Sequence, residues 1–373
     1  MKKIFVEIYL QFNLGDDLFL DTIAKQFPEC DFTINYLGSH YDKFLKNYPN
    51  VKRRKYNIFN KLGQRLKLTD SITNYNEVAK EHDALLFIGG SIFREEEYHK
   101  PLYNDRLKLI MEFKKSNKPV YILGANFGPV KTEGFINDYR NLFQLCTDVC
   151  FRDLYSYELF KELKQVRYAP DIIFQVDLTK YKDKTVENHV GFSIIDVRHK
   201  HGLSNYYEEY INSTVKSITL LVNKGYKCSL MSFCEKEGDL DIIYTILDKL
   251  HPNISRCVTI YSYDGNLKEA INLIASFNLF IAARFHANIL SLLLGIKLLP
   301  IIYSSKTINM LRDIKFNNCN VKMDNLELQY DESVLSNLDQ KVLNIGDIIK
   351  NAEKQFTKLK EFTKNETGYR GIV

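Results

Sequence analysis

The sequence predicts an α/β fold of two doubly wound domains, each a parallel sheet with helices on both faces. Apolar runs alternate with amphipathic runs along the whole chain, as in parallel sheets linked by helices. The length of 373 residues is more than one core usually organises and suits two. A polar, strand-free segment at 177–188 is predicted to link the two domains, and we expect a cleft between them. The expected boundaries are 1–176, 189–345 and, for a C-terminal helix and tail, 346–373.

The first half alternates from its beginning. An apolar strand at 2–10 leads through a polar loop at 13–17 to a helix at 17–27 with its apolar residues on one face. Further strands are expected at 32–37, 84–91, 119–129 and 148–153, and helices at 102–116 and 154–163. The segment 169–174 closes this half.

The second half repeats the pattern. Strands are expected at 189–195, 226–233, 258–261, 279–282 and 297–302, with helices at 205–225, 240–250, 266–276, 285–294 and about 346–365. Gly225 is a typical helix stop, and Asp239 is a plausible N-cap. The final helix is polar on most faces.

Composition excludes several classes of protein. Hydrophobic residues make up 45% and charged residues 26%, which is ordinary for a soluble globular protein. No apolar stretch approaches the roughly 20 residues that span a bilayer. The apolar run at the N-terminus is short and carries Glu7, so we expect a core strand, no signal peptide and a cytoplasmic location.

Seven cysteines without a CxxC pair predict buried free thiols, including Cys150, Cys228 and Cys257.

Positive charge is concentrated in one segment. Residues 43–69 hold nine Lys or Arg and no acid, interleaved with aromatic and leucine side chains. One interpretation is a solvated basic loop. The other is a surface that meets anionic lipid at the inner face of the membrane or a phosphate-bearing substrate. We do not expect nucleic acid as a partner, because a single patch on a chain of net charge +5 is weak evidence for it.

The candidate site lies after the strands, because ligands of such sheets bind outside the carboxyl ends. Arg284 and His286 stand where a buried strand meets a helix N-terminus, which suits an anion. Arg152 follows another strand, where an ion pair with a nearby acid is the alternative. Lys306 follows "LLPIIYSS", whose serines, Ser305 among them, are able to cap the next helix. Together these cations suit a small, multiply charged anion.

Other polar loops are less specific. Residues Asn13, Gly15 and Asp16 either hold a sugar or anion or make a turn. The loops "FIGGS" and "LGANFGP" allow close backbone approach to a ligand, but neither is a nucleotide-binding motif. An HxH at 199–201 lacks further ligands, so we expect no metal. We interpret the acids at positions 235, 237, 239 and 241 as helix-start charges.

Several of these segments, in this order, resemble polysaccharide pyruvyl transferases. They are "FNLGDDLFLDTIAKQF", "LFIGGSIF", "LGANFGP", "CFRDLYSYELF", "RYAPDIIF" and "ARFHANILSLLLGIKLLPIIYSSKT", and they extend from about residue 10 to about residue 315. The strongest piece is "RFHA" at 284–287, which matches the family's Arg-Leu-His-Ala pattern with Phe285 in place of Leu.

The resemblance implies two Rossmann-like domains in a GT-B-like arrangement, with the acceptor on the N-terminal and the donor on the C-terminal domain. The donor would be phosphoenolpyruvate and the product a pyruvate ketal on a sugar of a cell-surface glycan or its precursor. No further cofactor is implied. Donor contacts are expected from Arg152, Arg284, His286, Ser305 and Lys306, with His286 as catalytic acid and Arg284 as catalytic cation. Acceptor contacts are expected from Asn13, Gly15, Asp16, Gly90, Ser91, Asn126 and His199. Candidates for the base are Asp16, His199 and Glu235.

Two other functions remain open on the residues alone. One is a GT-B glycosyltransferase that uses a nucleotide sugar, because fold does not decide function. The other is a non-catalytic binding protein for anionic glycans. The sequence does not identify the acceptor sugar, the carrier of that sugar (lipid, nucleotide or polymer) or the oligomeric state.

Overall fold

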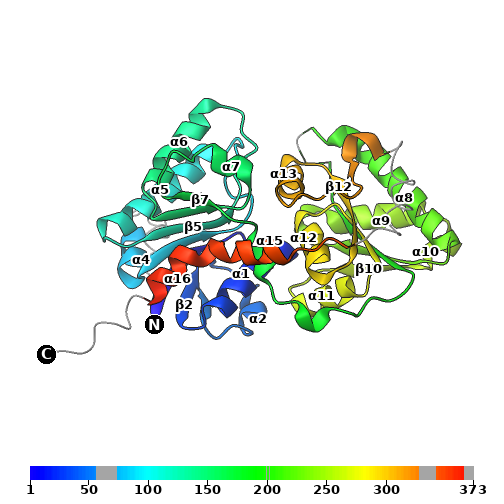
Figure 1. Cartoon of the computed structure of the whole chain (residues 1–373), viewed down its shortest axis with the longest axis horizontal. Coiled ribbons are helices and arrows are strands. Elements are labelled where there is room, and N and C mark those ends of the chain that lie inside the picture. The colour runs from blue at the N-terminus through cyan, green and yellow to red at the C-terminus, as the bar shows by residue number, and fades with distance from the viewer. Residues whose placement is uncertain (56–73, 199, 201, 327–341, 365–373) are drawn as a thin grey trace, which may run out of the picture. The chain divides into compact units, whose positions relative to one another are not determined.

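The computed structural model describes residues 1–55, 74–198, 200, 202–326 and 342–364. Within them the chain forms two parallel sheets, each with helices on both faces (Figure 1). Every strand pair is parallel, so the predicted class of two doubly wound Rossmann-like domains is confirmed.

The first unit is built on a seven-stranded sheet with the order β3-β2-β1-β4-β5-β6-β7. Its strands are β1 (Lys2–Glu7), β2 (Cys30–Ile34), β3 (Val51–Arg53), β4 (Ala84–Ile88), β5 (Val120–Ala125), β6 (Asp148–Phe151) and β7 (Val166–Tyr168). All five residues of β4 are buried, as expected of a central parallel strand covered on both faces.

Helices cover both faces of this sheet. They are α1 (Leu14–Gln26), α2 (Asp42–Leu45), α4 (Tyr75–Glu81), α5 (His99–Lys115), α6 (Glu133–Gln144), α7 (Leu154–Glu158) and, near the C-terminus, α16 (Thr357–Lys364). The helix α15 (Gly346–Ala352) spans the point where the chain passes from the second unit to the first. Figure 1 shows α4, α5 and α6 on one face, with α1 and α16 on the other. On the α5 and α6 side, Phe127, Phe143 and Phe160 pack edge to face in the core.

The second unit has a six-stranded sheet of order β10-β9-β8-β11-β12-β13. Its strands are β8 (His189–Ile194), β9 (Lys227–Ser232), β10 (Val258–Ser262), β11 (Leu279–Ala282), β12 (Lys297–Ile302) and β13 (Val321–Lys322). Its helices are α8 (Tyr207–Asn223), α9 (Asp239–Lys249), α10 (Pro252–Ser255), α11 (Leu267–Ala275), α12 (Phe285–Leu294) and α13 (Ser305–Asp313). Helices α8 and α9 cover one face, and α11 and α12 the other (Figure 1).

The observed division of the chain differs from the expected boundaries at both ends. Residues 10–18, which follow β1, group with the second unit, whereas residues 350–373 group with the first. The fully buried side chain of Gln355 anchors the C-terminal segment to the first unit: its carbonyl accepts from Gly124 N at 3.0 Å and its amide donates to Ala169 O at 2.7 Å. Phe356 and Leu359 are fully buried as well, on one narrow face, and most other residues of α15 and α16 are exposed or half-buried, so the C-terminal helix is polar on most faces, as predicted.

The basic segment 43–69 contains regular structure in its described part. Phe44, Leu45 and Tyr48 are buried in the first unit, and β3 forms the edge of its sheet. These apolar side chains are core residues, so within 43–55 a contact with an anionic lipid or a phosphate would have to be made by the basic side chains. The remainder, 56–69, lies outside the described residues.

Three smaller expectations were wrong. The helix at 154–163 ends at Glu158. Cys257 is exposed, whereas Cys150 and Cys228 are buried thiols as predicted. Asp239 is the first residue of α9 and not its N-cap, which is Gly238. In the part of the chain that the structure describes, no helix is both long and apolar enough to cross a bilayer.

Candidate active site

Arg284 stands between β11 and α12, where it is the N-cap residue of the helix. Its side chain is 8% exposed. The guanidinium binds Asp239 in bidentate fashion: Nε donates to Oδ2 at 2.9 Å, and Nη2 donates to Oδ1. Nη1 donates to Glu237 Oε2 at 2.6 Å. Two carboxylates thus fix the position of this buried cation.

Arg284 keeps capacity for another acceptor. A guanidinium carries five N–H donors, and the bonds to the two carboxylates use three of them. One N–H remains on each terminal nitrogen. A further anion can therefore bind these two donors without displacing Asp239 or Glu237.

Asp239 also joins α9 to the end of β9. Its Oδ2 accepts from Phe233 N at 3.1 Å and from Cys234 N at 3.0 Å, and the residue is fully buried. A carboxylate in such a place requires a counter-charge, and Arg284 supplies it.

Positive charge gathers around Glu237. Lys200 Nζ lies 3.5 Å from Glu237 Oε2. Burial by itself would raise the pKa of Glu237, but the charges of Arg284, Lys200 and Lys306 lower that pKa to about 2. Burial also disfavours charge on Arg284, yet Asp239 and Glu237 raise its pKa well above the usual value. Both groups are therefore ionised at neutral pH.

His286 lies in the first turn of α12 and is half-buried. Its ring packs edge to face on Phe285 with centroids 5.1 Å apart. It also lies directly against Gly15: a Cβ built on that glycine would overlap Nδ1 of the ring. Gly15 is therefore required for the close approach of the loop that precedes α1 to the histidine.

We expect a Gly15→Ala substitution to displace the His286 ring. The added methyl group overlaps the imidazole, so ring or loop must move, at a cost of about 1–3 kcal/mol for such overpacking. NMR signals of the His286 ring and urea unfolding measure the two effects. Gly134→Ala is the matched control, because the nearest atom to its added Cβ is 3.9 Å away. Unchanged His286 signals in Gly15→Ala would contradict the contact.

Lys306 follows β12, in the first turn of α13. Its Nζ lies 5.7 Å from the ring centroid of Phe285 and 5.9 Å from that of Tyr303, so the first turns of α12 and α13 are neighbours. The buried hydroxyls of Ser304 and Thr307 have no hydrogen-bond partner among the described residues. This helix start therefore offers a cation and two unused hydroxyl groups. Ser305, predicted beside Lys306, is exposed there.

The loop before α1 contributes to the same cluster. Asn13 makes the turn, because its Oδ1 accepts from Gly15 N at 3.0 Å, and its Nδ2 donates to Glu237 Oε1 at 3.1 Å. Asp16 follows in the first turn of α1. The next residue, Asp17, is fully buried and accepts from Tyr263 OH at 2.7 Å. This turn therefore contacts both residues: Asn13 donates a hydrogen bond to Glu237, and Gly15 lies against the His286 ring.

The remaining predicted residues form a second cluster, in the first unit. Arg152 Nη1 donates to Asp171 Oδ2 at 2.8 Å, and Nη2 donates to Asn126 Oδ1 at 2.6 Å. Ser91 Oγ donates to the same Asn126 oxygen at 3.0 Å. A Cβ on Gly90 would overlap the Arg152 guanidinium. Arg152 thus has an ion-pair partner in Asp171.

Sequence reasoning missed the residues that hold the cations. Asp239 and Glu237, interpreted as helix-start charges, are the partners of Arg284. The available signal was that both follow the end of a predicted strand. His199 lies outside the described residues, and Glu235 is exposed. Among the residues with described positions, no group of three or more His, Cys, Asp or Glu side chains is arranged to hold a metal ion.

Several solved structures have a similar fold. Anabaena Alr3699/HepE in complex with UDP and glucose matches with a TM-score of 0.58 and 11% identity over 98% of this chain and 100% of that one. A putative UDP-N-acetylglucosamine 2-epimerase from Listeria monocytogenes matches with a TM-score of 0.59 and 11% identity over 100% and 99%. At these identities the likeness shows the fold alone, which is GT-B-like.

A curated relative comes from polysaccharide biosynthesis. The amylovoran biosynthesis protein AmsJ of Erwinia amylovora is 23% identical over 270 residues, which is 67% of this chain. The chain spans 63% of the length of that relative. The family model for polysaccharide pyruvyl transferase matches residues 13–305, which include Glu237, Asp239, Arg284 and His286 and end just before Lys306. The chain therefore belongs to the polysaccharide pyruvyl transferase family.

Proposed function

We propose that this protein transfers the enolpyruvyl group of phosphoenolpyruvate to a sugar of a cell-surface glycan or its precursor. The product is a pyruvate ketal, and phosphate is released. The observation that carries the proposal is the cationic cluster at the starts of α12 and α13, in a chain of this family.

The charges of the cluster suit this donor. Phosphoenolpyruvate carries a carboxylate and a phosphate on a small frame, so it needs several cations close together. Arg284 offers two N–H groups beyond those bound to the carboxylates, and Lys306 places an ammonium group at a neighbouring helix start.

The reaction requires one acid and one base. A proton is added to the methylene carbon of the donor while a sugar hydroxyl attacks the adjacent carbon and loses its proton. The bond from this carbon to the phosphate oxygen then breaks, and a second hydroxyl of the same sugar closes the ketal as its proton leaves. Arg284 and Lys306 would stabilise the departing phosphate.

His286 is our choice for the acid, because imidazole titrates near neutral pH and stands beside Arg284 at the helix start. Asp16 is the favoured base among the candidates, since it follows Gly15, which contacts the His286 ring. Arg152 is proposed to contact the donor as well, and its neighbours Gly90, Ser91 and Asn126 to bind the acceptor.

Calorimetric titration with phosphoenolpyruvate tests the proposal. We expect the native chain to bind it and Lys306→Ala to bind it about tenfold or more weakly, the loss typical of one charge-assisted contact. Lys306 is preferred to Arg284 because its removal leaves no buried carboxylate unpaired. Lys268→Ala, at an exposed position of α11, is the control. Binding of uridine or cytidine diphosphate without phosphoenolpyruvate would indicate a glycosyltransferase instead.

A further inference from the structure

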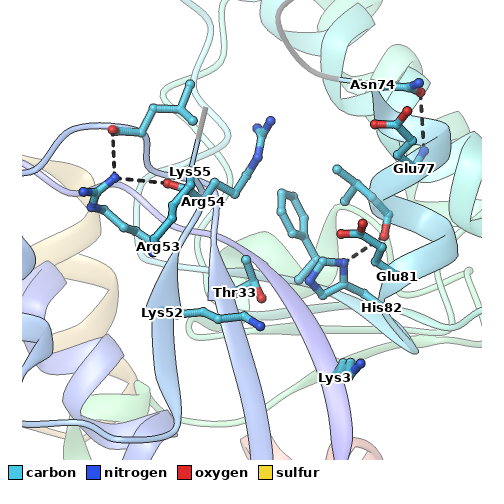
Figure 2. Close-up of a pocket in the computed structure, with 13 residues that line it drawn as sticks. Lys3, Thr33, Lys52, Arg53, Arg54, Lys55, Asn74, Glu77, Glu81 and His82 are labelled. Atoms are coloured by element: carbon cyan, nitrogen blue, oxygen red, sulfur yellow. Dashed lines mark hydrogen bonds between the residues drawn. The ribbon is translucent and has the colours of Figure 1, made fainter. Parts of the chain in front are cut away.

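A pocket lies in the first unit, and none of its lining residues belongs to the Arg152 cluster. It has a volume of about 710 Å³ and lies between the strands β1, β2 and β3 and the helix α4. Figure 2 shows Lys3, Thr33 and Lys52 on three neighbouring strands, with Glu81 and His82 on the opposite wall. A volume of this size is in the range of small-molecule sites, roughly 300–1,000 Å³.

The lining of the pocket is strongly basic. Five of its side chains carry a permanent positive charge and two are acidic: Lys3, Lys52, Arg53, Arg54 and Lys55, against Glu77 and Glu81. Arg53 is neutralised by a bidentate ion pair with Asp42, with Nη2 to Oδ2 at 3.0 Å. The other cations still outnumber the two carboxylates, so the pocket attracts anions.

The cations surround an aromatic floor. Phe5 is fully buried, and its ring lies edge to face with His82, with centroids 5.2 Å apart. The guanidinium carbon of Arg54 lies 5.9 Å from the Phe5 centroid, and its Nη1 donates to Asn35 Oδ1 at 2.6 Å. These contacts hold Arg54 in place. The ammonium groups of Lys3, Lys52 and Lys55 make no ion pair with any residue whose position is described.

His82 is a neutral member of the lining. It is buried, and its Nδ1 lies 2.8 Å from Val78 O, to which it donates. Burial lowers the pKa of His82, and the nearby Lys52 lowers it further. A bound anion would raise the pKa of the His82 ring. A measured change in this pKa would therefore detect binding in the pocket.

From this geometry we propose that the pocket binds a phosphate-bearing ligand, with its phosphate or diphosphate group between Lys52, Arg54 and Lys3. Phosphate concentrates up to two negative charges on one small group, which fits several cations from separate strands better than a single carboxylate does. This chemistry is shared by a soluble phosphate ester and by the headgroup of an anionic lipid.

Titration with inorganic diphosphate tests the site, with Lys52→Gln as the variant. Lys52 is exposed, so its loss does not threaten the fold. We expect saturable binding to the native chain, about tenfold or more weakening in Lys52→Gln, and a rise in the pKa of the His82 ring measured by NMR. Lys46→Gln is the matched control, since Lys46 is exposed in the same basic segment and does not line the pocket.

Flotation with vesicles separates the two sources of phosphate. Recruitment of the native chain, but not of Lys52→Gln, to phosphatidylcholine vesicles that contain phosphatidylglycerol would identify a lipid headgroup. Diphosphate binding without recruitment would identify a soluble phosphate ester. Absence of both, or an equal loss in Lys46→Gln, overturns the proposal. The pocket shares no residue with the proposed donor site, so this outcome is separate from the test of transferase activity.

Discussion

Replacement of His286 with alanine is expected to slow phosphate release from phosphoenolpyruvate by about 10²–10⁴-fold. The imidazole is the proposed acid that protonates the methylene carbon, and no other titratable side chain of α12 stands at its start. Donor affinity should change only a few-fold, because Arg284 and Lys306 keep their charges. Single-turnover assays and calorimetry on the same variant separate the two quantities.

Two controls keep this prediction specific. His40→Ala removes an exposed histidine of the first unit and should leave turnover unchanged. His286→Asn retains a polar side chain at the helix start but cannot deliver a proton to carbon, so it should be as slow as the alanine variant. Turnover at the native rate in either His286 variant would eliminate this residue as the acid.

Replacement of Asp239 with asparagine is expected to lower the free energy of unfolding of the second unit by about 3–5 kcal/mol. The substitution keeps the shape of the side chain and removes its charge. Arg284 would then be a buried cation without its main counter-charge, in a place where the two side chains are 8% and 0% exposed. Hydrogen exchange of the amides of β9 and β11 measures the loss in this unit alone.

The matched comparison is an exposed ion pair. Lys249 and Glu208 are 2.8 Å apart, with side chains 38% and 66% exposed. Glu208→Gln should cost less than about 1 kcal/mol, because water screens such a pair. If Asp239→Asn cost no more than Glu208→Gln, the buried pair would not be what holds Arg284 in position.

The local pattern of apolar and polar residues was sufficient to predict most strands and helices of the fold. The hydrophobic periodicity and apolar content of the sequence predicted β4, β8, β11 and β12 to within a few residues. A strand that is buried on both faces must be apolar along its whole length. The pattern failed for β3, where Val51 stands among basic residues. It located the C-terminal helix but gave no sign that its few apolar residues pack against the first unit. Short edge strands and docking helices carry little periodic signal.

The candidate site was predictable in part. The rule that ligands meet the carboxyl ends of parallel strands selected Arg284, His286 and Lys306, and the structure brings these three to adjacent helix starts. It did not select Asp239 or Glu237 as their partners. An acid at the start of a helix has the same local pattern whether it faces water or a buried guanidinium.

The sequence by itself determined the α/β class, the two sheets, the family and the residues that lie at the carboxyl ends of the strands. Only the tertiary structure decided that Arg284 is paired with Asp239, that Gly15 presses against His286, and that Lys3, Lys52 and His82 line one pocket. The physical reason is that periodicity and propensity act between near neighbours. Ion pairs, close approaches and pockets depend on where distant segments meet when the sheets are assembled.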